Sequence, residues 1–223
     1  MRFVVPLRTI HARPNPRYFG RGRGSTYLSM VSDQAMGTAG RVLSGTPRDS
    51  PRLLDLIYSR DGGPRPETVI TDTGSYSDLV WGLLRLLDVD YRPQLADVPD
   101  QKLWLIDPAA GYGPLNATAR GRVELGKVRA HWVDMLRVAT SVHTGSVSAY
   151  DVIRVLQHGG SPTPLGEAIP HYGRIFKTLH LLTMVDDEPY RRQIKAMRNL
   201  SEALQGLARR VPRAYRRNCG TAT

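Results

Sequence analysis

The 223-residue sequence has little of what defines several classes of protein. Its single cysteine, Cys219, permits no internal disulfide, and no group of cysteines and histidines has zinc-binding spacing, which favours a reducing compartment. No run approaches the roughly 18 apolar residues of a membrane span, so we expect no membrane partner. The apolar start of the chain, MRFVVP, is too short and too quickly followed by arginines for a secretory signal, and we expect a cytoplasmic protein.

Acidic residues are missing from both ends of the chain. Residues 1–32 contain six arginines and no acid, residues 209–217 contain five more arginines, and no acid follows Glu202. These eleven arginines equal the formal net charge of +11, so the middle of the chain sums to zero. Basic ends on a neutral middle favour a polyanion, most simply nucleic acid. A GC-rich genome would explain the scarcity of lysine but not the missing acids.

The hydrophobic pattern predicts an α/β protein whose helices and strands follow a clear order. Three strands come first, then a helix that Asp49 or Ser50 caps, and then a strand, a helix and a further strand. Such an order predicts a mixed sheet in an α/β layer. The predicted strands cover residues 2–9, 26–31, 40–43, 68–71 and 91–95.

From about residue 114 to 189 only helical periodicity remains, so we expect an all-α insertion there. Ser148 with Asp151 has the spacing of a capping box, and Thr163 precedes a proline at a first helical position. A last helix is expected after Pro189. The acids at 186–188 directly precede this helix, where negative charge is favourable, and are therefore expected to be structural.

Asp72 is the best single candidate for chemistry. It follows the predicted strand 68–71, at the carboxyl end where open α/β sheets place their ligands. A carboxylate is also the hard oxygen ligand that Mg²⁺ prefers. The alternative is that Asp72 only begins a turn. Nearby Asp78 is expected to be structural, in a capping box with Ser75.

Glu202 is a second candidate, although periodicity argues against it. It lies nearly opposite the apolar stripe of the last helix, one turn after Arg198, so an exposed ion pair is the simpler expectation.

Residues 12–24 are rich in glycine, proline and arginine and predict a loop. Its glycines do not fit a phosphate-binding loop, because no helix is expected to open after them. We expect arginines in and around this loop to bind backbone phosphates of DNA: Arg8, Arg13, Arg17, Arg21 and Arg23.

Six segments, in order along the chain, resemble the catalytic region of Tn3-family transposases, the large enzymes that move replicative, cointegrate-forming bacterial transposons. The likeness extends from Met1 to about Ala208. The segments are MRFVVPLRTIHARPNPRYFG (1–20), GTPRDS (45–50), TDTGSYSD (71–78), PQLAD (93–97), GRIFKTL (173–179) and DEPYRRQI (187–194).

The resemblance implies a ribonuclease-H-like fold, with the core over residues 1–113, the helical insertion over 114–188 and a last core helix over 189–211. It implies three carboxylates that hold two Mg²⁺ ions for DNA strand cleavage and transfer. Asp72 corresponds to the second carboxylate and Glu202 to the family's glutamate, about 4–8 Å apart when they share an ion. The implied partners are double-stranded DNA, as transposon ends and target, and further copies of the protein. The implied location is the bacterial nucleoid.

The sequence departs from the family pattern at both ends. The family's first aspartate lies in an Asp-Gly pair immediately before the residues that match Met1, and it is not in this sequence. The basic tail 212–223 lies outside the resemblance, where a changed reading frame would explain its arginines. We therefore expect an incomplete, inactive fragment with impaired Mg²⁺ binding. The alternatives are a non-catalytic DNA-binding remnant and a pseudogene product.

Overall fold

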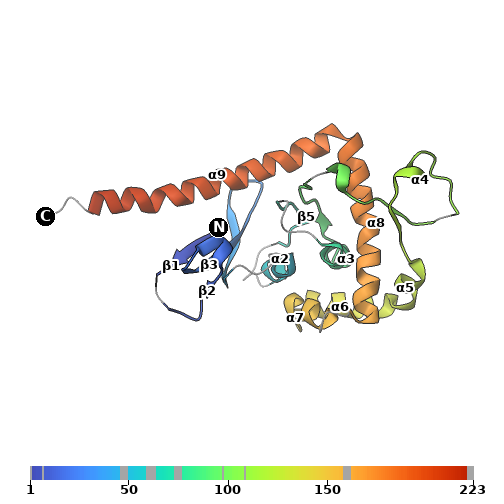
Figure 1. Ribbon diagram of the computed structural model, residues 1–223, viewed down its shortest axis with the longest axis horizontal. Coiled ribbons are helices and arrows are strands. Elements are labelled where there is room, and N and C mark those ends of the chain that lie inside the picture. The colour runs from blue at the N-terminus through green and yellow to red at the C-terminus, as the bar shows by residue number, and fades with distance from the viewer. Residues whose placement is uncertain are drawn as a thin grey trace. The chain divides into compact units, whose positions relative to one another are not determined.

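The computed structural model describes residues 2–6, 8–45, 50–58, 64–72, 77–96, 98–107, 109–157 and 162–219 (Figure 1). The chain divides into two compact units, residues 1–47 with 193–223, and residues 48–192. Helices and short strands are mixed along the chain, which confirms the α/β class. The described strands form three separate sheets, where the sequence predicted one mixed sheet.

The first unit is built on an antiparallel sheet with β3 at its centre. Gly24 of β3 pairs with both β1 and β2, and the next residue pairs with both β1 and β4. β1 therefore occupies one edge of β3, and β2 and β4 share the other. The strands are β1 (Arg2–Val5), β2 (Arg13–Pro14), β3 (Arg23–Val31) and β4 (Gly37–Ser44).

The predicted loop 12–24 is wrong in part, because it contains β2 and the short helix α1 (Pro16–Phe19). Asn15 caps this helix by accepting a hydrogen bond from the Arg17 amide at 3.1 Å, and Pro16 occupies its first turn. Asparagine followed by proline is a helix-start signal, which the high glycine and arginine content of the segment obscured.

The second unit contains a parallel strand–helix–strand segment, as predicted. It consists of β5 (Thr68–Val69), α3 (Asp78–Leu86) and β6 (Asp90–Tyr91). Backbone hydrogen bonds continue the strand pairing beyond these short elements, since the Arg92 amide donates to the Val69 carbonyl at 2.9 Å and the Gln94 amide to the Thr71 carbonyl at 2.8 Å. The pairing that begins at β6 therefore extends to Gln94, close to the predicted strand end at residue 95.

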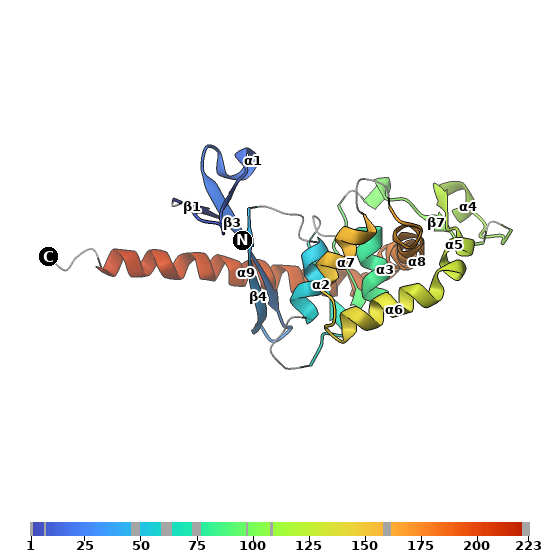
Figure 2. The same cartoon turned by 90° about the horizontal axis from the view of Figure 1, so that it is seen from below.

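Helices make up most of the rest of the second unit, and α2, α3, α7 and α8 pack against one another (Figures 1 and 2). This unit also contains a second parallel strand pair, formed by β7 (Trp104–Leu105) and β8 (Gly121–Arg122). β8 lies inside the segment expected to be all-α, and two residues are too few to show strand alternation. The helices are α2 (Ser50–Tyr58), α4 (Leu115–Thr118), α5 (Leu125–Ala130), α6 (Trp132–His143), α7 (Ala149–Leu156) and α8 (Pro164–Asp186), with a short 3₁₀ turn at Val98–Asp100.

The two longest helices agree with the sequence signals at their starts. Thr163 caps α8 by accepting a hydrogen bond from the Gly166 amide at 3.0 Å. Asp187 accepts one from the Tyr190 amide at 3.1 Å at the start of α9 (Glu188–Cys219), and Glu188 pairs with Arg192 at 2.7 Å. These contacts agree with the structural role expected for Asp187 and Glu188, and α9 continues beyond the predicted end at 211.

The capping box predicted at Ser148 is wrong. Ser148 does not cap α7 through a capping box; its hydroxyl donates to Asp55 of α2 at 3.0 Å, and the same carboxylate oxygen accepts the Tyr150 amide at 3.1 Å. Ser77 caps α3, with its hydroxyl accepting the Val80 amide at 3.3 Å. Ser75 and Asp49, the other predicted capping residues, lie outside the described residues.

Two glycines bring α3 and α8 into backbone contact. A Cβ atom at Gly173 would overlap the carbonyl oxygen of Asp78, and one at Gly82 would overlap the carbonyl oxygen of Ile169. The absence of both side chains therefore sets the distance between these helices. None of the helices in the described ranges is both long and apolar enough to cross a membrane.

Candidate active site

Asp72 lies exposed at the carboxyl end of β5, as predicted from the sequence. The residue before it is held twice by the neighbouring strand. The Thr71 carbonyl accepts the Gln94 amide at 2.8 Å, and the Thr71 hydroxyl lies 3.0 Å from the Tyr91 hydroxyl. The strand side of Asp72 is thus fixed by hydrogen bonds to the β6 segment.

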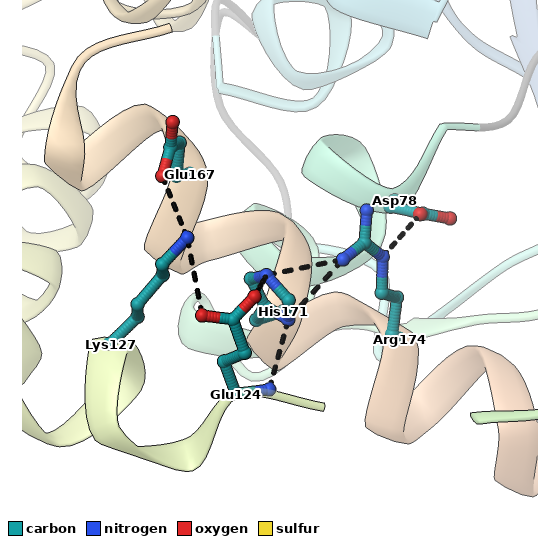
Figure 3. A network of polar contacts seen from close by, with 6 residues as sticks. All are labelled: Asp78, Glu124, Lys127, Glu167, His171 and Arg174. Atoms are coloured by element: carbon teal, nitrogen blue, oxygen red, sulfur yellow. Dashed lines mark hydrogen bonds and ion pairs between the residues drawn. The ribbon is translucent and has the colours of Figure 1, made fainter. Parts of the chain in front are cut away.

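Asp78, six residues further on, is anchored to α8. One carboxylate oxygen accepts from Arg174 Nε at 2.9 Å (Figure 3). The other lies 3.7 Å from Lys177 Nζ. Asp78 is the first residue of α3, where a negative charge is also favoured by the helix dipole. The geometry supports the structural role expected for Asp78.

Arg174 belongs to a larger polar network around His171 (Figure 3). The Glu124 amide donates to His171 Nδ1 at 3.1 Å, so this nitrogen carries no proton. Burial, with a further contribution from Arg174, lowers the pKa of His171. Lys127 pairs with Glu167 at 2.9 Å; this hydrogen bond raises the pKa of Lys127 and lowers that of Glu167. The network thus contains three acids and two bases around His171: Asp78, Glu124 and Glu167, with Lys127 and Arg174.

The partners in this network come from distant parts of the sequence. Asp78 and Arg174 are 96 residues apart, and Glu124 and His171 are 47 apart. Helical periodicity cannot pair residues at such separations, so sequence reasoning missed the network. Its only sequence signal was the charge on the GRIFKTL segment, which contains Arg174 and Lys177.

Glu202 lies on α9 with 65% of its side chain exposed, and its carboxylate is 3.5 Å from Arg198 Nε. This is the exposed ion pair that periodicity alone predicts. Glu202 belongs to the first unit and Asp72 to the second, so the expected distance between their carboxylates stays a prediction.

The five arginines expected to bind DNA all lie in the first unit. Four of them are exposed and Arg23 is half-buried. Arg2 and Tyr18 lie beside this group: the Arg2 guanidinium is 4.2 Å from the centre of the Tyr18 ring, and that of Arg17 is 5.5 Å from it. Aromatic rings between arginines suit contact with nucleic acid, and the Arg-Tyr pair in the sequence was a signal for it.

A buried histidine connects α8 to the start of α9. His180 Nε2 donates to the Pro93 carbonyl at 3.0 Å, so Nδ1 accepts from the Tyr190 hydroxyl at 2.7 Å. Burial lowers the pKa of His180 to about 4 and raises that of Tyr190 to about 12. Both residues line a pocket of about 410 Å³, together with Trp81 and Phe176. Neither group changes protonation near neutral pH, so we assign them a structural role.

A divalent metal ion would find one suitable donor in Asp72, an exposed hard-oxygen ligand at a strand end. Within the described ranges, no group of three or more histidine, cysteine, aspartate or glutamate side chains is placed to hold a metal ion. The described residues thus place one candidate donor, Asp72, after β5 and do not assemble a metal site around it.

The fold and this carboxylate define an α/β protein with an acid at the end of a parallel strand. A family model described as "Tn3 transposase DDE domain" matches residues 1–219, and the chain belongs to this family. The match continues further than the resemblance that ended near Ala208.

Several curated transposases are similar to the chain. It is 57% identical to the transposase for transposon Tn4556 of Streptomyces fradiae over 211 residues, which cover 95% of this chain and 24% of that protein. It is 40% identical to the transposase for transposon gamma-delta of Escherichia coli (strain K12), over 95% of this chain and 21% of that protein. It is 34% identical to the transposase for transposon Tn1546 of Enterococcus faecium, with the same coverage. The chain thus spans about a fifth to a quarter of these relatives, and no solved structure matches it.

Proposed function

We propose that residues 1–223 act as the catalytic region of a Tn3-family transposase, which cleaves and joins DNA strands during replicative transposition. The observation that carries the proposal is the position of Asp72, exposed at the end of a parallel strand in a chain that matches the family over 219 residues. The proposal includes a ribonuclease-H-like arrangement of the core, with transposon ends and target DNA as substrates in the bacterial nucleoid and an oligomer as the acting form.

In this proposal Asp72 and Glu202 hold Mg²⁺. When bound, such ions activate the attacking hydroxyl and stabilise the leaving oxygen of a phosphoryl transfer. For Glu202 to bind a metal ion, its carboxylate must leave the ion pair with Arg198 and contact the metal ion instead. The sequence from Met1 supplies two of the three carboxylates that the family uses, so we propose that residues 1–223 alone bind the metal weakly and do not cleave DNA.

Adding the missing pair of residues tests this proposal directly. The chain is prepared with Asp-Gly placed before Met1, with Asn-Gly as the matched control, and nicking of supercoiled plasmid is measured with Mg²⁺ or Mn²⁺. We expect nicking only with Asp-Gly, and its loss in the Asp72→Asn variant. Nicking by the original chain would refute the proposed impairment. If the Asp-Gly chain neither nicks DNA nor loses Mn²⁺ binding on Asp72→Asn, the catalytic proposal is wrong.

A second candidate function, DNA binding without catalysis, is favoured by the charge of the two units. Residues 1–47 with 193–223 contain fourteen basic and two acidic residues, a formal charge of +12, whereas residues 48–192 contain seventeen and eighteen, a formal charge of −1. The entire excess of positive charge therefore belongs to one unit. A unit of this charge attracts DNA by releasing counterions, whatever its catalytic state.

The salt dependence of duplex binding tests this second function. Replacing Arg13, Arg17 and Arg21 together by glutamine should reduce the slope of log K against log salt by up to about 3, since each phosphate contact contributes about 0.9. The matched control replaces three exposed arginines of the second unit, which changes the net charge equally and should leave the slope nearly unchanged: Arg120, Arg129 and Arg137. Equal slopes for the two triple variants would exclude the first-unit arginines as the contact surface.

A further inference from the structure

The pocket of about 410 Å³ in the second unit is lined by residues of α3, β6, α8 and the first turn of α9. We infer that it binds a nucleotide, with the base against aromatic side chains and the phosphate at Arg85. The inference adds a site to the one at Asp72, and it uses the proposed function only in that DNA is a source of nucleotides. The volume lies within the range of roughly 300–1,000 Å³ that is usual for ligand pockets.

Four side-chain rings in contact with one another line the pocket: Trp81, Tyr91, His180 and Tyr190. The centre of the Trp81 ring lies 5.0 Å from that of Tyr91 and 5.0 Å from that of His180. The His180 and Tyr190 rings are 5.5 Å apart, and the hydrogen bond of 2.7 Å between them holds both in place without a ligand. Aromatic rings stack on any base, because every base has a π-face.

Arg85 brings a positive charge to the same pocket. Its guanidinium lies 5.1 Å from the centre of the Phe176 ring, which also lines the pocket. The Arg85 side chain is 42% exposed, and its pair with Asp88 spans 3.8 Å to a side chain that is 96% exposed, so a phosphate can replace this weak pair. Asp90, an acid in the lining, is paired with Arg92 at 2.6 Å and its charge is therefore balanced.

The lining also contains a hydrogen-bond donor that no described residue uses. Only 3% of Trp81 is exposed, and its indole Nε1 is buried without a partner in the described part of the chain. A buried donor without a partner costs stability, so one beside a pocket calls for an explanation. The ring nitrogens and carbonyl oxygens of a base are suitable acceptors, once the base displaces the atoms that cover this nitrogen.

The alternative occupant is an apolar side chain of a partner protein. It would cover the rings, and the half-exposed Leu179 in the lining suits it as well as it suits a base. It would, however, leave the charge of Arg85 and the donor of Trp81 unmatched. A nucleotide has a phosphate for the first and acceptors for the second, so it is the ligand that all three features favour.

The fluorescent base aminopurine tests the inference, because its emission is quenched when it stacks on an aromatic ring. Two sources of the nucleotide are compared on the 223-residue chain: the free deoxynucleoside monophosphate of aminopurine, and a DNA duplex with one unpaired aminopurine. The same duplex with its aminopurine paired corrects for binding by the arginines of the first unit. The DNA measurement is therefore the ratio of the two duplex affinities.

Phe176→Leu removes a ring but keeps an apolar side chain, and Arg85→Gln removes the charge. The matched controls are Tyr172→Leu, one turn before Phe176 on α8, and Arg137→Gln on α6, since neither residue lines the pocket. We expect each pocket variant to weaken binding of the free monophosphate about fivefold, the lower end of the effect of losing a ring that stacks on a base, and the controls to leave it unchanged. The aminopurine deoxynucleoside, which lacks the phosphate, should bind Arg85→Gln and the unaltered chain equally.

Thermal unfolding of each variant establishes that it folds; if Phe176→Leu does not, Leu179→Glu at an exposed lining position should weaken binding by repelling the phosphate. Binding of the free monophosphate identifies a free nucleotide as a ligand, and a preference for the unpaired duplex alone identifies DNA as the source. The inference is refuted if neither is bound, or if the pocket variants bind like the controls. Loss of binding in Phe176→Leu but not in Arg85→Gln would show an apolar site and refute the nucleotide as its ligand. Asp72→Asn should change none of these measurements, so a failure of the proposed catalytic site is seen separately.

Discussion

The substitution Gly173→Ala tests the backbone contact between α3 and α8 in the second unit. A methyl group at this position would overlap the Asp78 carbonyl oxygen and lie 2.7 Å from the Gly82 amide nitrogen. Both are backbone atoms within a packed helix pair, so neither can move aside as a flexible side chain would. Overpacking of this kind costs about 3 kcal/mol at the upper end of its usual range.

The gain in helix propensity opposes this cost. Alanine is about 1 kcal/mol better than glycine inside a helix, so we expect a net loss of about 2 kcal/mol. For a chain of 223 residues this corresponds to a decrease in Tm of about 4–8 °C. Urea unfolding and thermal unfolding followed by circular dichroism would measure both quantities.

The matched control is Gly206→Ala in α9, where no atom lies within 4 Å of the added Cβ. Only the propensity gain applies there, so this variant should be stabilised by up to about 1 kcal/mol. If Gly173→Ala is as stable as the unaltered chain, or is stabilised like the control, the backbone contact between α3 and α8 is wrong.

Three further predictions concern the second unit. His180 stays neutral in the folded chain because burial lowers its pKa from 6.5 to about 4, whereas the unfolded chain takes up a proton below pH 6.5; stability should therefore fall by up to about 3 kcal/mol from pH 7 to pH 4. Urea unfolding of His180→Gln should show a weaker fall over this range, and an equal fall would refute the assignment. Asp55→Ala should cost about 3 kcal/mol, since it removes a buried carboxylate that accepts the Ser148 hydroxyl and the Tyr150 amide and pairs with Arg52 at 3.4 Å. Ser148→Ala should cost only about 1 kcal/mol, and equal losses in denaturant unfolding would show that Asp55 does not cap α7. Thr163→Ala should lower the free energy of unfolding by about 1 kcal/mol through loss of the α8 cap, and no change in the same assay would exclude this cap.

The parts of the fold that depend on local patterns could be predicted. The strand–helix–strand segment around Asp72 was readable because each element buries a regular set of apolar side chains, such as Leu79, Val80, Leu83 and Leu84 on α3. Thr163 was readable as a cap because the bond it makes is within four residues. The two-residue strands β2, β7 and β8 could not be predicted, since their stability comes from pairing with distant segments and not from their own alternation.

The candidate site was predictable only one residue at a time. The position of Asp72 could be predicted because it directly follows the apolar run 68–71, which by itself indicates where the strand ends. The partners of Asp78 could not be predicted, because they depend on where α8 crosses α3, and that crossing depends on two glycines 91 positions apart. The same limit explains the capping box at Ser148, where a partner on α2 replaced the expected local bond.

The structure changes the interpretation of the arginines at the C-terminal end of the sequence. Residues 209–217 looked like a tail outside the resemblance, whose arginines a changed reading frame would explain. The backbone of α9 instead continues without a break to Cys219, and the family match continues to residue 219. Both basic ends also belong to the same compact unit. A reading-frame accident would produce neither a continued match nor a continued helix, so the second set of arginines has the same claim to DNA binding as the first.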